Sequence, residues 1–173
     1  MRNKSLIKTT YTAIFTAIIL LSTMLITFST GLGEGYIHFG DCFIYLTACV
    51  LPFPYCLVAS ALGGALADIL GGYAIWAIPT AIIKTLIALP FALACKKEKS
   101  EKILNKRIAL MPIVSGIITI LGYFAAECVL YSVASATLSI IGNSIQAVAS
   151  GILFYITATA LDKINFKRRI NNG

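Results

Sequence analysis

The sequence predicts an all-α membrane protein, namely a six-helix transmembrane bundle with both termini in the cytoplasm. Of its 173 residues, 58% are hydrophobic and only 12% are charged, and the mean hydropathy is +0.88. Soluble domains carry about a quarter charged residues. Apolar segments near the ~20 residues that cross a bilayer recur along the chain. These observations indicate one integral membrane domain that covers residues 1–173.

We expect helices at residues 9–29, 37–51, 54–71, 75–95, 109–132 and 141–162. The first follows a basic start, but its apolar stretch is long and no A-x-A cleavage site follows, which favours a retained helix over a signal peptide. The second is doubtful, because only about 15 residues separate the glycine-rich segment from the Pro52–Phe53–Pro54 turn. Length alone therefore leaves five or six spans open.

The distribution of positive charge decides between five and six spans. Fourteen Lys and Arg against seven Asp and Glu give a net charge of +7. The cations gather at the N-terminus, in the loop 96–108 and in the tail 163–169. Six spans place all three clusters on one side, in agreement with the enrichment of Lys and Arg in short cytoplasmic segments. The charge thus indicates topology, and we expect no nucleic-acid partner.

Polar residues within apolar sequence mark a candidate binding site. A charged side chain at the bilayer centre costs roughly 2.5 to 3.5 kcal/mol, so such residues normally face a bundle interior or a cavity. The six-span topology places nearly all of them in the outer half of the membrane. The candidate substrate-binding residues are Glu34, His38, Asp41, Asp68, Tyr73, Trp76, Thr80, Lys84, Tyr123, Glu127, Tyr131, Asn143 and Gln146.

Helical spacing groups many of these residues into stripes, because residues four apart share a helix face. Lys84 lies about 12 Å below the start of its helix, deep enough to form the floor of an outward-facing pocket. Apolar walls with a few convergent polar groups are typical of small-ligand sites. The three stripes expected to line it are Trp76, Thr80 and Lys84; Thr119, Tyr123, Glu127 and Tyr131; and Asn143, Gln146 and Ser150.

A structural role is the alternative for each charged candidate. Lys84 would then pair with Asp68 or Glu127 to hold helices together, or extend toward the interface. Glu127 would be a solvated residue near a helix end. The aromatic candidates Tyr73 and Trp76, with Tyr131, would form an interfacial belt.

The sequence shows no catalytic or metal-binding apparatus. It lacks G-x-x-x-x-G-K-[ST], H-E-x-x-H and G-x-S-x-G, so we expect neither an enzyme nor the ATPase of a pump, and no cofactor. His38 is the one histidine and has no metal-ligand partner at suitable spacing, which favours a loop residue and no metal site. The five cysteines form no C-x-x-C pair and are interpreted as packing residues.

Small residues predict close helix packing. The expected helix 54–71 carries Ala59, Gly63 and Ala67 on one face, and Ser60 and Gly64 on the next. Such rows let helix backbones approach closely. In the first helix, Ala13 and Ala17 are also four residues apart, but alone this pattern is a weak signal.

Two segments, GYIHFGDCFIYLTA (35–48) and GGALADILGGYAIWAIPTAIIK (63–84), resemble the substrate-binding S components of energy-coupling factor (ECF) vitamin transporters. The resemblance covers essentially the whole chain and is greatest to small S components for hydroxymethylpyrimidine, pyridoxine or riboflavin-type substrates. It implies capture of a vitamin from outside, with residues 30–40 closing over it. It also implies a transmembrane T component and two ATPase subunits as partners, with toppling in the membrane to open the site inward. Ala13 and Ala17 match the family's A-x-x-x-A motif, which docks on the T component.

The resemblance transfers no ligand list, because binding residues in this family vary with the substrate. Mixed charge beside abundant aromatics favours a flat heteroaromatic ring with hydroxyl groups, such as a pyrimidine or pyridine vitamin. An alternative function is a stand-alone proton-coupled carrier or channel, with Asp41, Asp68, Lys84 and Glu127 as a relay. Such carriers commonly show repeated halves and broken helices. A third is a scaffold protein with structural ion pairs.

Overall fold

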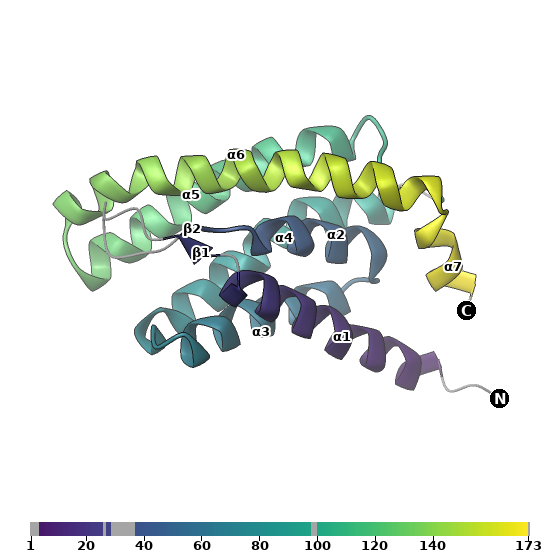
Figure 1. The fold of residues 1–173 in the computed structure, drawn as a ribbon, viewed down its shortest axis with the longest axis horizontal. Coiled ribbons are helices and arrows are strands. Elements are labelled where there is room, and N and C mark those ends of the chain that lie inside the picture. Colours follow the sequence, from purple (N-terminus) through teal and green to yellow (C-terminus); the bar gives the residue numbers. More distant parts are fainter. Residues whose placement is uncertain (1–3, 26, 29–36, 98–99, 173) are drawn as a thin grey trace.

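The computed structural model describes residues 4–25, 27–28, 37–97 and 100–172 and shows a bundle of helices (Figure 1). Four helical segments there are long and apolar enough to cross a membrane: Ser5–Leu25, Ala74–Lys96, Ile108–Leu130 and Val133–Lys163. The all-helical membrane class is thus confirmed, apart from two short strands. The α-helices are α1 (Lys4–Leu25), α2 (Gly40–Val50), α3 (Tyr55–Leu70), α4 (Ala77–Lys97), α5 (Met111–Leu130), α6 (Val133–Lys163) and α7 (Phe166–Asn172). Single 3₁₀ turns, η1 (Ala74–Trp76) and η2 (Ile108–Leu110), precede α4 and α5.

Helix α2 differs most from the sequence expectation. It has 11 residues, which span about 16 Å, and this is too short for a hydrocarbon core of about 30 Å. All of its residues except Phe43 are buried. It packs against α1, α3, α4 and α6 in the middle of the bundle (Figure 1). The helix expected at 37–51 is therefore shorter than predicted, and protein surrounds most of it.

Two other helix boundaries also differ from the prediction. Helix α1 ends at Leu25 instead of residue 29, and the strand β1 (Thr27–Phe28) then pairs antiparallel with β2 (Ile37–His38). Helix α6 begins eight residues before the predicted start at residue 141. Its N-cap is Ser132, whose hydroxyl accepts a hydrogen bond from the backbone N–H of Ser135. A serine at this position satisfies an N–H group that the first helical turn leaves without a partner.

The three cationic segments lie at the same end of the bundle. The ammonium of Lys8 lies over the ring of Tyr55, 5.9 Å from its centroid, and Lys96 lies 5.8 Å from the ring centroid of Phe53. The carboxylate of Asp162 near the end of α6 accepts two backbone N–H hydrogen bonds from the loop that follows α4. Figure 1 shows the start of α1 and the helix α7 on the same side of the bundle. The expected gathering of positive charge at one end is thus present in the fold.

Three aromatic rings form the centre of the core. Tyr45 of α2 stacks on Phe91 of α4 with ring centroids 4.6 Å apart. Phe154 of α6 meets both rings edge-on, at 5.9 and 5.1 Å. Stacked and edge-on pairs are the favourable arrangements of aromatic rings. This aromatic layer joins three helices in the middle of the bundle.

The small residues of α3 permit close contact on two sides. A Cβ atom added at Gly63 would lie 2.7 Å from Ile19 Cγ2 and 3.1 Å from the carbonyl oxygen of Thr16, both on α1. One added at Gly64 would lie 2.7 Å from Cγ of Lys84 on α4. The two rows of small residues therefore serve two neighbouring helices, which confirms the packing interpretation.

Replacement of Gly63 by valine should destabilise the bundle. The new side chain would overlap Ile19 and backbone atoms of α1, and overpacking typically lowers the free energy of unfolding by about 1–3 kcal/mol. The matched control is Ala125→Val on the exposed face of α5. Thermal unfolding in detergent measures both, and equal melting temperatures for the two variants would contradict this account of the α1–α3 contact.

Candidate functional site: a buried ion pair beside an aromatic wall

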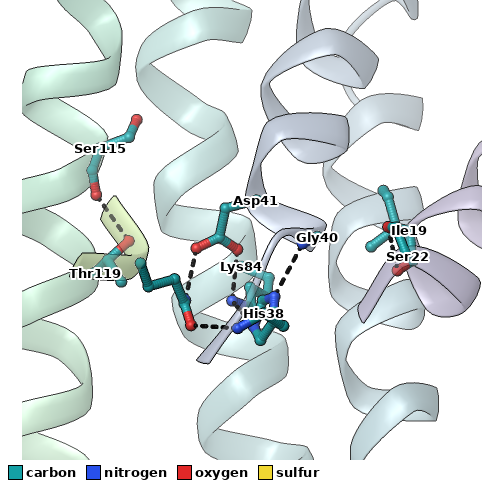
Figure 2. Close-up of polar contacts among 9 residues, drawn as sticks. Ile19, Ser22, His38, Gly40, Asp41, Lys84, Ser115 and Thr119 are labelled. Carbon is teal, nitrogen blue, oxygen red and sulfur yellow. Dashed lines mark hydrogen bonds and ion pairs between the residues drawn. The ribbon is translucent and has the colours of Figure 1, made fainter. Parts of the chain in front are cut away.

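A fully buried ion pair lies between α2 and α4. Lys84 Nζ is 2.6 Å from Asp41 Oδ1, and both residues are 0% exposed (Figure 2). Asp41 lies in the first turn of α2, and Lys84 lies two turns into α4. Lys84 therefore pairs with Asp41, whereas the structural alternative had expected Asp68 or Glu127.

Gln146 of α6 completes the coordination of the carboxylate. Its side-chain nitrogen donates to Asp41 Oδ2 at 2.9 Å, and its side-chain oxygen accepts from the backbone N–H of His38 at 3.2 Å. The cluster therefore joins β2, α2, α4 and α6. A buried ion pair is stable only when further hydrogen bonds satisfy its remaining polar atoms, and Gln146 supplies one of them.

His38 lies in this cluster between two hydrogen-bond donors. Its Nδ1 is 3.0 Å from the backbone nitrogen of Gly40, and its Nε2 is 3.2 Å from Lys84 Nζ (Figure 2). A neutral imidazole has one acceptor nitrogen and an imidazolium has none. A neutral ring is therefore the form that suits this position, and it accepts a hydrogen bond from one of the two donors. The interpretation of His38 as an ordinary loop residue is wrong, because this side chain is buried against Lys84.

Aromatic side chains cover the cluster on the side of α5 and η1. The ring centroid of Tyr123 is 5.1 Å from Lys84 Nζ, which is a cation–π distance. Trp76 lies 6.0 Å from Tyr123 and 5.9 Å from Tyr131, measured between ring centroids. The buried indole N–H of Trp76 has no hydrogen-bond partner among the described residues. A ring bound here would meet aromatic faces and one free donor.

Two further carboxylates are buried in the same half of the bundle. Glu127 accepts hydrogen bonds from the hydroxyls of Ser135, at 2.9 Å, and Ser139, so it is not the solvated residue of the structural alternative. Asp68 is buried near the C-terminus of α3. Together with Asp41 they give three buried carboxylates against the ammonium of Lys84 in this region.

The chain matches the family described as "ECF-type riboflavin transporter, S component" over residues 3–163. It belongs to this family. A protein of Pyrococcus woesei described as "Uncharacterized protein in gap 3'region" is 32% identical over 133 residues, which are 77% of this chain and 86% of that protein. The chain is therefore a multi-pass membrane protein and a substrate-binding subunit of a vitamin-type ECF transporter, rather than an enzyme. S components of such transporters work with a T component and ATPases.

The structure brings most of the predicted site residues of this S component into one region. His38, Asp41, Lys84 and Gln146 are joined by polar contacts. The predicted stripe of Trp76, Thr80 and Lys84 is buried along its whole length.

Three of the predicted site residues that the structure describes are more exposed than this cluster. Tyr73 and Tyr131 are exposed, at 42% and 43%, although Tyr131 still contacts Trp76. Asn143 is half-buried and lies well inside α6 instead of at its start, as does Gln146. Glu34 lies outside the described residues.

Two glycines shape the site, although the sequence pattern had predicted no site role for either. A Cβ atom at Gly40 would overlap the hydroxyl of Thr23, and the backbone N–H of Gly40 contacts His38. Gly64 leaves the space in which the stem of Lys84 lies. The row of small residues on α3 was a usable signal for Gly64, whereas Gly40 carried none.

Removal of one member of the ion pair should destabilise the protein more than removal of both. Lys84→Met leaves Asp41 as a buried, uncompensated carboxylate, which typically costs about 3–5 kcal/mol of folding free energy. The double variant Lys84→Met/Asp41→Asn should recover a large part of this loss, because the neutral amide still accepts from Gln146. Thermal unfolding of the ligand-free protein measures both.

The control for this pair of variants is Lys96→Met, which removes an exposed lysine from the same helix and should leave the melting temperature nearly unchanged. Additive losses in the double variant would show that the two side chains are not energetically coupled.

Proposed function

We propose that this S component captures a small, water-soluble heteroaromatic vitamin or precursor from outside the cell, best represented by hydroxymethylpyrimidine or a pyridoxine-like ring. A T component and two ATPase subunits would then complete its ATP-driven uptake. The observation that carries the proposal is the position of Tyr123 beside the buried Lys84–Asp41 pair, with Trp76 against Tyr123. A flat ring with polar substituents needs an aromatic surface for its faces and polar groups for its substituents.

The chemistry of these rings matches the groups at the site. A ring nitrogen or hydroxyl oxygen would accept from the indole N–H of Trp76, which lacks a partner among the described residues. Amino and hydroxyl groups would donate to buried carboxylates in this half of the bundle, which Asp41, Asp68 and Glu127 supply as acceptors. Buried polar groups that are left unmatched reject ligands strongly, so this combination favours polar heteroaromatics over apolar rings.

Riboflavin is the second candidate substrate, because the description of the matching family names it. Its isoalloxazine ring system is larger and less rich in donors than an aminopyrimidine. The two candidates differ in the aromatic area that they need, which the residues Trp76, Tyr123 and Tyr131 would have to supply. A direct comparison of affinities separates them.

We further propose six passages with cytoplasmic termini and a site that opens outward. The contacts of Lys8 with Tyr55 and of Lys96 with Phe53 support it, because they place the start of α1, the start of α3 and the end of α4 together. The short α2 would thus return the chain through the interior. The positive charge at this end favours the cytoplasmic side.

The aromatic layer favours capture over a stand-alone proton relay. Tyr45 follows Asp41 by one helical turn, and with Phe91 and Phe154 it fills the space below the ion pair with carbon-rich side chains. A proton path needs a continuous series of titratable groups or water. A site closed on its cytoplasmic side would instead require another subunit to release its cargo.

Docking of the T component on α1 is supported by the exposure of its two small residues. Ala13 and Ala17 are exposed, whereas Phe15 and Ile19 of the same helix are buried in the core. Small side chains permit close approach of a second helix. We therefore propose the face with Ala13 and Ala17 as the contact with the T component.

Binding of a heteroaromatic ligand should change the fluorescence of Trp76, the one tryptophan of the chain. Stacking near the indole alters its environment, so titration with hydroxymethylpyrimidine or pyridoxine should give a saturable change, and riboflavin a weaker affinity. Ribose, which has hydroxyls but no aromatic ring, is the control ligand. Saturable binding in a thermal-shift titration without any change in Trp76 emission would place the ligand elsewhere.

Replacement of Ala13 by leucine should abolish uptake and leave ligand binding intact. The larger side chain would separate α1 from the T component by bulk alone, while the site lies on other helices. Ile14→Leu, at an exposed neighbouring position, conserves volume and is the matched control. Uptake of labelled vitamin by cells with the complete transporter measures the effect, and a normal rate for Ala13→Leu would reject this docking face.

A further inference from the structure

A pocket lies at the end of the bundle where α1 begins and α7 lies, away from the proposed ligand site. It has a volume of about 670 Å³ and is lined by the start of α1, the turn between α2 and α3, the end of α4 and the helix α7. Four cations line it, namely Lys8, Lys96, Lys167 and Arg168, and Glu101 is the one acidic residue among its described lining residues. The excess of positive charge indicates an anionic ligand.

Lys167 is the most informative of these cations. It is only 8% exposed, lines the pocket, and has no hydrogen bond or ion pair with any residue that the structure describes. The stem of Lys167 is largely covered by protein, and its ammonium, held at the pocket without a described partner, would be stabilised by an anion there. The neighbours Phe166 and Ile170 pack against the core, so α7 holds Lys167 at this position.

The other cations lie where they can reach a common anion. Lys8 and Lys96 are exposed and rest on the aromatic rings of Tyr55 and Phe53, so their ammonium groups remain available. Arg168 lies 3.8 Å from Glu101, and the side chains of both are more than half exposed. Such a surface pair contributes little and leaves the guanidinium free to exchange partners.

Compensation of helix dipoles does not account for this arrangement. Cations near the C-termini of α2 and α4 are favourable, because the last carbonyls carry partial negative charge. Lys167, however, makes no hydrogen bond to a described carbonyl and borders an open volume instead. The open volume and the four cations around it favour an anionic ligand.

We propose that this pocket binds the phosphate headgroup of an anionic phospholipid. The chain is a membrane protein, and the pocket lies where its long helices begin and end, which is the level of the headgroups. Apolar walls adjoin the cations: Leu51 and Ala92 line the pocket, and Phe53, also a lining residue, is 47% exposed. Phosphate next to hydrocarbon is the chemistry of a phospholipid, and basic clusters of this kind bind anionic headgroups.

The test compares an anionic with a zwitterionic lipid on the whole purified chain. The protein in a neutral detergent is titrated with dioctanoyl phosphatidylglycerol, with dioctanoyl phosphatidylcholine and with inorganic phosphate, and bound lipid is counted by native mass spectrometry. Phosphatidylglycerol should bind saturably and more tightly than the other two. Lys167→Gln and Lys96→Gln should each weaken it about fivefold, the effect of one cation near an anionic headgroup.

Lys106→Gln is the matched control, since it removes an exposed cation of the basic loop that does not line the pocket, and it should leave binding unchanged. If Lys167→Gln fails to fold, the exposed Lys96 decides. Equal binding of the two lipids, or equal weakening by Lys106→Gln, would overturn the proposal. Tight binding of inorganic phosphate alone would assign the pocket to a soluble anion and also reject the lipid.

Discussion

The ion pair between Lys84 and Asp41 is the constraint on which the rest of the structure depends. Both charges are completely buried, and such burial is favourable only if the charges meet each other and additional polar groups. This requirement fixes four elements at once, because Asp41 lies on α2, Lys84 on α4, Gln146 on α6 and His38 on β2. The pair therefore holds the short central helix in register with two long helices.

The central helix divides the bundle interior into layers. Asp41, Tyr45 and Cys49 follow one another at intervals of four residues on α2, which is about 6 Å per step along the helix. Asp41 lies in the ionic cluster and Tyr45 in the aromatic layer. Cys49 lines the pocket proposed to bind a phospholipid headgroup. Ionic chemistry at one end of the helix is thus separated from the cations at the other end by packed rings. A helix too short to span the membrane organises the interior in this way because all of its faces contact protein.

The long helices were predictable from sequence because the bilayer sets their length, and the stripe from Trp76 to Lys84 was predictable because helical periodicity places residues four apart on one face. The partner of Lys84 was not, since pairing across helices depends on how each helix is rotated, which one sequence does not reveal. The true length of α2 was hidden for a related reason, because apolar sequence looks the same whether lipid or protein surrounds it. The early start of α6 depended on Ser132, a capping signal that hydropathy does not register.

The proposed ligand site has two kinds of polar group, and they have different consequences for specificity. Asp41, Lys84 and Gln146 satisfy one another in the ligand-free protein, so a ligand gains from them only the difference between its own hydrogen bonds and those it replaces. The indole N–H of Trp76 is buried without a described partner, and a ligand that offers an acceptor there loses nothing in exchange. The internal hydrogen bonds of the cluster therefore stabilise the ligand-free protein. The indole N–H of Trp76 would instead raise the affinity for a ring that carries an acceptor at its edge. Asp41, Lys84 and Gln146 thus determine the stability of the ligand-free protein, and the neighbouring Trp76 determines selectivity for the ligand.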